Sequence, residues 1–127
     1  NVRPFSVEEA KQFIKTKPQL LSQNEMYMVA QTYEPGSKEF NEVFAIAALM
    51  YPDDPTANLN AACADINADK WADALRKLDK AGDSAEADNA RGVCYWQIGN
   101  ETKAIESFKK AADKGCYTAR RNLEDIQ

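Results

Sequence analysis

The chain contains no histidine. Imidazole is the usual base of Ser-His-Asp and Cys-His catalysis and a common zinc ligand, so these catalytic arrangements and most zinc sites are excluded. A glycine-rich phosphate loop is also missing, because the five glycines are scattered along the sequence. The paired carboxylates, such as Asp53 with Asp54, are explained as charges at helix N-termini. We therefore expect no enzyme activity, no metal and no cofactor.

Long hydrophobic runs and an excess of positive charge are lacking too. The richest apolar run, residues 43–51, is nine residues long, whereas a membrane span needs about 18 or more. No basic-then-apolar leader opens the chain. The net charge is −4, which disfavours nucleic acid as a partner, since nucleic-acid binding usually shows as a basic face. We expect no membrane span in this segment and no nucleic-acid partner, and the oligomeric state stays open.

Strand signals are absent, and helix signals are frequent. Ser6 with Glu9, and Ser22 with Glu25, have the spacing of capping boxes. Pro18 stops the first helix, while Asp54 and Pro55 suit the cap and first position of a new one. Further starts are expected at Asp69, Ser84 and Thr118, with Gly82, Gly99 and Gly115 closing helices. The sequence predicts an all-α fold of seven to eight helices of about 10–14 residues, with short links that make neighbours antiparallel.

A weak internal repeat gives the best indication of how these helices pack. Within residues 85–118, small and aromatic side chains stand at spacings of 3, 4, 5, 4 and 3, namely Gly92, Tyr95, Gly99, Ala104, Phe108 and Ala111. This spacing fits two helices whose backbones touch at the small residues. Residues 55–83 have a similar pattern, with Ala62, Trp71, Ala74, Leu78 and Ala81. A unit of about 30–35 residues is typical of stacked helical hairpins.

These positions resemble the tetratricopeptide (TPR) repeat and its Sel1-like relatives. A third, more degenerate unit is similar around Ala30, Tyr33, Phe40, Phe44, Ala47 and Pro52. The resemblance implies a right-handed α-α superhelix, a TPR-like solenoid of about three hairpins. We expect one domain over 1–127: an N-terminal helix and strap at 1–21, hairpins at 22–118, and a C-terminal capping helix at 119–127.

The sequence departs from the TPR pattern in two places. Asp88 and Arg91 stand where the family has tryptophan and leucine, and the second helix of the 55–83 unit is about one turn short. The short segments 2–6, 24–26 and 29–37 also resemble the C-terminal helical segment of Bacteroidales cell-envelope proteins. That second resemblance implies a piece of a larger exported protein in the cell envelope, associated with the periplasm or the outer membrane.

In TPR arrays the first helix of each hairpin lines a concave groove. By the register above, candidate peptide-binding residues share this face: Tyr27, Gln31, Leu59, Asn60, Cys63, Asn67, Asn89, Trp96 and Gln97. Amides can bond a peptide backbone, and Trp96 can either anchor a ligand or pack between units. Cations are lacking on these faces, so a carboxylate clamp is not expected. The resemblance favours a non-enzymatic module that binds a protein or peptide; the alternative is a structural spacer docking on its own parent chain.

The three cysteines are predicted to be small buried hydrophobes with free thiols. None stands in a Cys-x-x-Cys spacing. Cys63 and Cys94 both fall on first helices of successive units, so a disulfide between them is the alternative.

Overall fold

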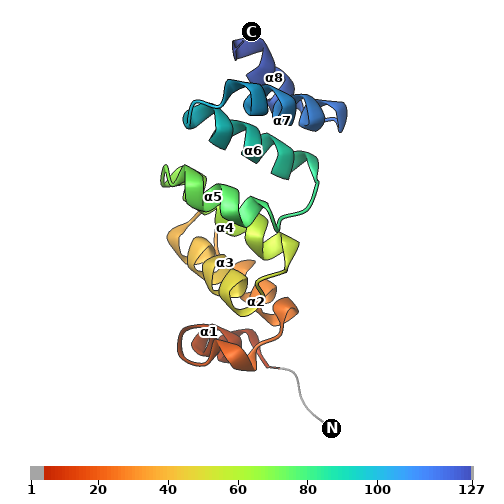
Figure 1. Ribbon diagram of the computed structural model, residues 1–127. Helices are drawn as coiled ribbons and strands as arrows, with labels where there is room; N and C mark the ends of the chain where they lie inside the picture. The colour runs from red at the N-terminus through yellow and green to blue at the C-terminus, as the bar shows by residue number, and fades with distance from the viewer. Residues whose placement is uncertain (1–4, 127) are drawn as a thin grey trace.

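The computed structural model describes residues 5–126, and within this part of the chain every regular element is helical. Residues 2–4, part of the predicted cell-envelope resemblance, and residue 127, the end of the predicted capping helix, lie outside the described residues. The helices are α1 (Val7–Thr16), α2 (Gln23–Ala30), α3 (Lys38–Met50), α4 (Pro55–Asn67), α5 (Trp71–Leu78), α6 (Ala85–Gln97), α7 (Glu101–Asp113) and α8 (Tyr117–Ile126), with a 3₁₀ turn η1 (Pro18–Leu20). Figure 1 shows them stacked in chain order from α1 at one end to α8 at the other. The predicted all-α class is confirmed.

The predicted helix starts are mostly confirmed by cap geometry. The hydroxyls of Ser6 and Ser22 accept hydrogen bonds from the backbone N–H groups of Glu9 (3.2 Å) and Glu25 (3.1 Å), and both glutamates reciprocate. Asp54 caps α4 by accepting from the Thr56 N–H at 3.1 Å. These bonds satisfy N–H groups that would otherwise have no partner in the first turn. Local sequence therefore sets these helix boundaries.

Three predicted boundaries were wrong by one to a few residues. Asp69 does not cap α5: its φ of 60° places it in the left-handed link after α4, and Lys70 precedes α5 without a side-chain cap. Helix α5 ends at Leu78 rather than near Gly82. Helix α8 starts at Tyr117, one residue before Thr118. Short polar links offer more than one residue able to end a helix, so spacing alone misplaces the boundary.

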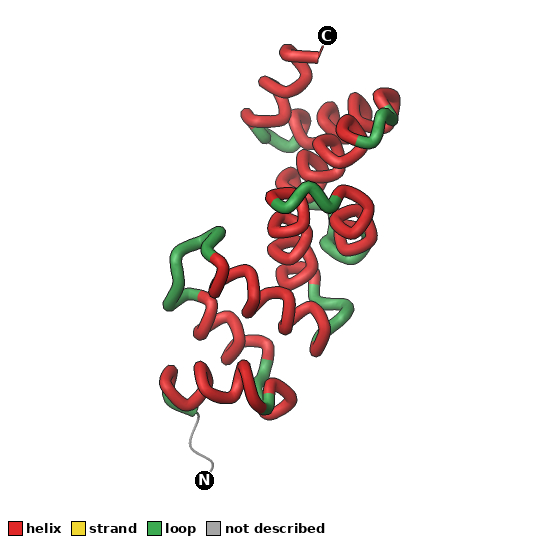
Figure 2. The backbone as a smooth tube through the Cα atoms, turned by 90° about the vertical axis from the view of Figure 1, so that its left-hand side faces the viewer, coloured by secondary structure: helices red, strands yellow, loops and turns green. Residues whose placement is uncertain are grey.

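Successive helices pack against each other as antiparallel pairs. The links from α4 to α5 (68–70) and from α6 to α7 (98–100) are three residues long, which folds each pair back into a hairpin. Helix α5 has 8 residues and α7 has 13, so the second helix of the middle hairpin is indeed the shorter. Helix α4 also contacts α6 directly, which places the first helices of two hairpins side by side. Figure 2 shows the helical column from a second side.

The core is divided along the column into three clusters. The N-terminal cluster joins α1, α2 and α3 around Ile14, Met26 and Phe44. The middle cluster is centred on Leu78 and contains Cys94, and the C-terminal one forms around Phe108, Ala104 and Ala119. Each cluster is shared by neighbouring helices only, as expected for a stacked array.

Helices α6 and α7 approach each other closely at Gly92. A Cβ atom placed on Gly92 would lie 2.5 Å from two ring carbons of Phe108, Cδ1 and Cε1. Gly92 is buried and Ala104, on the facing helix, is fully buried. The prediction that the small residues of this unit sit where helices meet is therefore confirmed at Gly92.

Among residues 5–126, no helix combines the length and the apolar character needed to cross a lipid bilayer.

Candidate functional site

The nine predicted groove residues all fall on the first helices of the hairpins or at their ends. Tyr27 is on α2 and Gln31 follows its last residue; Leu59, Asn60, Cys63 and Asn67 are on α4; Asn89, Trp96 and Gln97 are on α6. Because α4 packs on α6, residues from these two helices share one surface. The structure divides the nine into side chains held by packing and side chains left exposed.

Tyr27 and Leu59 are held by their neighbours. The Tyr27 hydroxyl donates a hydrogen bond to the carboxylate of Asp54, the cap of α4, and its ring centroid lies 5.8 Å from that of Phe44. Leu59 packs against the middle core cluster. Tyr27 thus joins α2 to the start of α4, and a peptide could reach only part of either side chain.

Asn89 and Trp96 face the C-terminal helix. The Asn89 side-chain oxygen accepts a hydrogen bond from the amide of Asn122 on α8 at 3.1 Å. Trp96 is half-buried and packs on the C-terminal cluster, as does Ile126 of α8. A hollow of about 240 Å³ remains between α6 and α8, with Trp96 and Ile126 in its wall. Helix α8 therefore occupies much of the face that Asn89 and Trp96 were predicted to offer.

The remaining predicted residues are open to solvent. Gln31, Cys63, Asn67 and Gln97 are exposed, and none of the three amides makes a side-chain hydrogen bond within the described residues. Asn60 is half-exposed and donates to the carbonyl of Thr56 on its own helix at 2.9 Å. These amides are available to bond a partner at little desolvation cost.

All three cysteines are free. Cys94 is fully buried, as predicted. The prediction of burial was wrong for Cys63, which is exposed: the middle cluster takes Leu59, Ala62 and Ile66 from α4 and not Cys63. Burial raises the pKa of the Cys94 thiol from 9.0 to about 11, with smaller contributions from Cys63 and Asp65 of α4. Desolvation also raises the pKa of the Cys63 thiol. Raised thiol pKa values leave little reactive thiolate at neutral pH.

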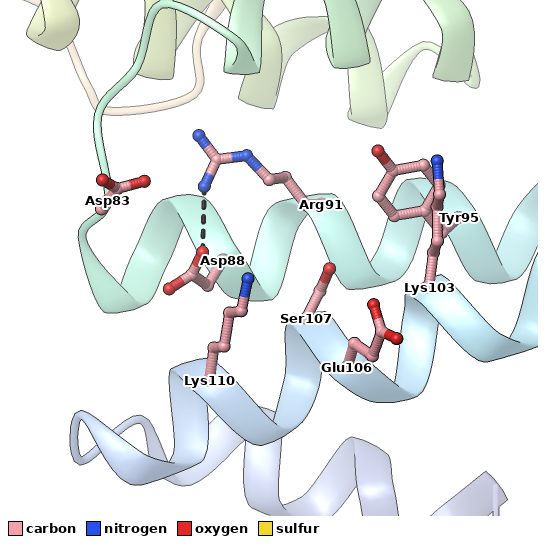
Figure 3. Close-up of a pocket in the computed structure, with 8 residues that line it drawn as sticks. All are labelled: Asp83, Asp88, Arg91, Tyr95, Lys103, Glu106, Ser107 and Lys110. Carbon is pink, nitrogen blue, oxygen red and sulfur yellow. Dashed lines mark hydrogen bonds and ion pairs between the residues drawn. The ribbon is translucent and has the colours of Figure 1, made fainter.

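A polar hollow of about 280 Å³ lies between α6 and α7 (Figure 3). Its wall holds three cations and three carboxylates together with Tyr95 and Ser107: Arg91, Lys103, Lys110, Asp83, Asp88 and Glu106. Lys103 Nζ lies 5.5 Å from the centre of the Tyr95 ring. The charges are balanced, so this hollow has no net preference for an anion or a cation.

The two residues that break the TPR pattern form the buried centre of this region. Asp88 is 4% exposed and accepts from Arg91 at 2.9 Å and from Lys114 at 2.5 Å. Arg91 also donates to the backbone carbonyls of Leu78 and Gly82, both at 2.6 Å. Lys114 reaches the Asp83 carbonyl as well. The network joins the end of α5, the start of α6 and the end of α7.

Sequence reasoning missed this network. Lys114 follows α7, and its ammonium group donates to the carboxylate of Asp88 on α6. The i, i+3 spacing of Asp88 and Arg91 on an otherwise small-residue face was the signal that could have found their pairing. Every charged group at the centre is partnered, so the network holds helices together and offers no free acid or base.

Among the described residues, no group of three or more potential ligands could hold a metal ion. No protein-family model matches the chain, and no curated protein matches it either.

Proposed function

We propose that this chain is a TPR-like scaffold that binds an extended peptide or a helix of another protein through the surface of its first helices. One observation carries the proposal: α4 packs directly on α6, and these helices present exposed amides that have no hydrogen-bond partner for their side chains among residues 5–126. The amides are Asn67 of α4 and Gln97 of α6, and Cys63 lies one turn before Asn67. A ligand can bond such amides without breaking an existing interaction.

The resemblance to TPR repeats supports the same proposal. Stacked hairpins create an extended surface that matches an extended ligand, because each unit adds a similar set of contacts. The observed hairpins, the close Gly92–Phe108 contact and the three linked core clusters are compatible with such an array. The right-handed superhelix and a place in the cell envelope belong to this proposal.

The structure changes which residues should bind. The sequence left open whether Trp96 anchors a ligand or packs between units, and its ring packs on the C-terminal cluster, which includes Ala119 of α8. We therefore assign binding to the exposed positions Gln31, Cys63, Asn67 and Gln97, with the uncovered part of Leu59 as the apolar contact.

Selection of a random peptide display library on the purified domain tests the proposal. The double variant Cys63→Arg, Asn67→Arg should abolish binding of the selected peptides, because two long charged side chains would fill the α4 surface. The matched control Ala72→Arg, Thr102→Arg adds the same charge at exposed positions on second helices. Circular dichroism melts should show that both variants stay folded.

Peptides that bind both variants as well as the parent would refute the first-helix surface. Failure to enrich any peptide would favour the alternative, a spacer that docks only on its own parent chain.

A further inference from the structure

Helix α3 carries more apolar surface than the core can bury. Its buried stripe is Phe40, Val43, Phe44 and Ala47, at spacings of 3, 1 and 3. A second stripe of α3 follows at Ala45, Ala48 and Leu49, and Pro52 extends it in the turn after the helix. Both stripes include parts of the longest apolar run of the chain, residues 43–51. An amphipathic surface helix normally has one apolar face, so the second stripe requires an explanation.

The second stripe is left uncovered by the fold. Leu49 is 78% exposed, the largest value among the exposed large hydrophobic residues of the described chain. Ala45 and Pro52 are exposed as well, and Ala48 is half-buried. Contiguous exposed apolar surface of this kind is typical of a binding face.

The same stripe forms the floor of a hollow of about 340 Å³ beside α5. Three cations at or just after the end of α5 form its rim, Arg76, Lys77 and Lys80, and no carboxylate lines it among the described residues. The buried Asn58 closes the base by donating to the carbonyls of Pro52 and Asp54, each at 2.9 Å. The turn after α3 is thereby held in place, and the hollow is already formed without a ligand.

Two of the three rim cations are available to a partner. Arg76 pairs with Asp73 and Lys80 with Asp53, but these side chains are 47–91% exposed. Exposed ion pairs contribute little, so a carboxylate brought in by a ligand can replace them. Lys77 is held more firmly, because Asp65 is only 14% exposed and lies 2.5 Å from the Lys77 ammonium.

We propose that this hollow, named here the α3–α5 hollow, binds an acidic segment of a partner protein that carries an aliphatic side chain. The aliphatic group lies on Leu49 and its neighbours, and the flanking carboxylates pair with Arg76 and Lys80. Charge complementarity selects this occupant: among the described residues the lining has three cations and no carboxylate, and exposed ion pairs alone hold Arg76 and Lys80. The hollow lies between second helices, so the inference goes beyond the first-helix surface of the proposed function.

A random peptide display library selected on the purified chain provides the probe. Enriched peptides should contain an excess of Asp and Glu around Leu, Ile or Met. Synthetic copies should lose affinity roughly threefold to thirtyfold in fluorescence anisotropy with Arg76→Gln, Lys80→Gln. Leu49→Gln should cost about tenfold. The matched control for the charge change is the double variant Lys38→Gln, Lys109→Gln, and the control for Leu49→Gln is Leu20→Gln. Both controls change exposed residues elsewhere on the chain and should leave binding unchanged.

Several results would overturn the inference. One is a selected pool with no acidic excess, and another is equal loss in the control variants. A third is cosedimentation with phosphatidylcholine–phosphatidylglycerol vesicles that needs Arg76 and Lys80 while no acidic peptide binds. Self-association that disappears with Leu49→Gln would instead make a second copy the occupant. Peptides whose binding is abolished only by Cys63→Arg, Asn67→Arg would support the proposed function and not this inference. Each of the two proposals can therefore be refuted without the other.

Discussion

Substitution of Gly92 by alanine gives the sharpest test of how α6 and α7 pack. The added Cβ would lie 2.5 Å from Cδ1 and Cε1 of Phe108 and 2.9 Å from Cγ. Carbon atoms in contact prefer about 3.5–4.0 Å, so the methyl group must move the ring by roughly 1 Å. Phe108 is only 3% exposed and sits in the C-terminal cluster, which leaves the ring little room.

Two effects oppose each other in this variant. Alanine in a helix interior is favoured over glycine by about 0.8–1.0 kcal/mol. Overpacking a tight core costs about 1–3 kcal/mol. The clash involves the body of the ring, so we expect the upper part of the overpacking range, about 2–3 kcal/mol. After the gain in helix propensity of about 1 kcal/mol, the free energy of unfolding should fall by about 1–2 kcal/mol. For a chain of this length that corresponds to a Tm lower by roughly 3–8 °C.

Urea and thermal unfolding of four proteins measure this effect: the parent, Gly92→Ala, Phe108→Leu and the double variant. Leucine lacks the planar ring, so Gly92→Ala should cost far less in the Phe108→Leu background. The double-mutant cycle isolates that difference as a coupling energy. A higher Tm for Gly92→Ala in the parent would refute the close approach, because helix propensity would then be the only effect.

Three further predictions concern Cys94, Asp88 and Trp96. Because the folded state raises the Cys94 pKa from 9.0 to about 11, the unfolded chain releases this proton first, and the free energy of unfolding should fall between those pH values. In urea titrations at several pH values, Cys94→Ala should weaken this pH dependence of the free energy of unfolding. An unchanged pH dependence would contradict the raised pKa of Cys94. Asp88→Asn should lower the free energy of unfolding by roughly 2–3 kcal/mol, since it leaves Arg91 without its buried partner, whereas Asp73→Asn should change it little. Trp96→Ala should lower it by roughly 2–3 kcal/mol if the ring packs against α8, and an unchanged melt would return Trp96 to the binding surface.

Much of the fold could be predicted because its helix boundaries are set by local chemistry. Ser6 and Ser22 cap their helices through atoms only three residues away, and Pro18 acts on the residue before it. Gly92 could be predicted from helical spacing, since a small residue opposite an aromatic one is a local pattern repeated in two helices. The errors at Asp69 and near Gly82 occurred in links, where several polar residues can end a helix.

The candidate surfaces depended on contacts between distant segments. The sequence placed Tyr27, Asn89 and Trp96 on first helices, and that placement holds. Their partners Asp54 and Asn122 come from 27 and 33 residues further along, and no spacing rule connects such positions. Spacing predicts which face of a helix a side chain occupies, but not which other helix covers that face.

The sequence by itself determined the all-α class, the hairpin order and most helix starts, because capping bonds and helical periodicity depend on residues that are close together in sequence. Tertiary structure alone decided that Lys114 would join the pair of Asp88 and Arg91, and that Leu49 would stay exposed beside the cations of α5. Burial and charge pairing depend on which helices meet in space. For that reason the binding surfaces appear only once the column of helices is assembled.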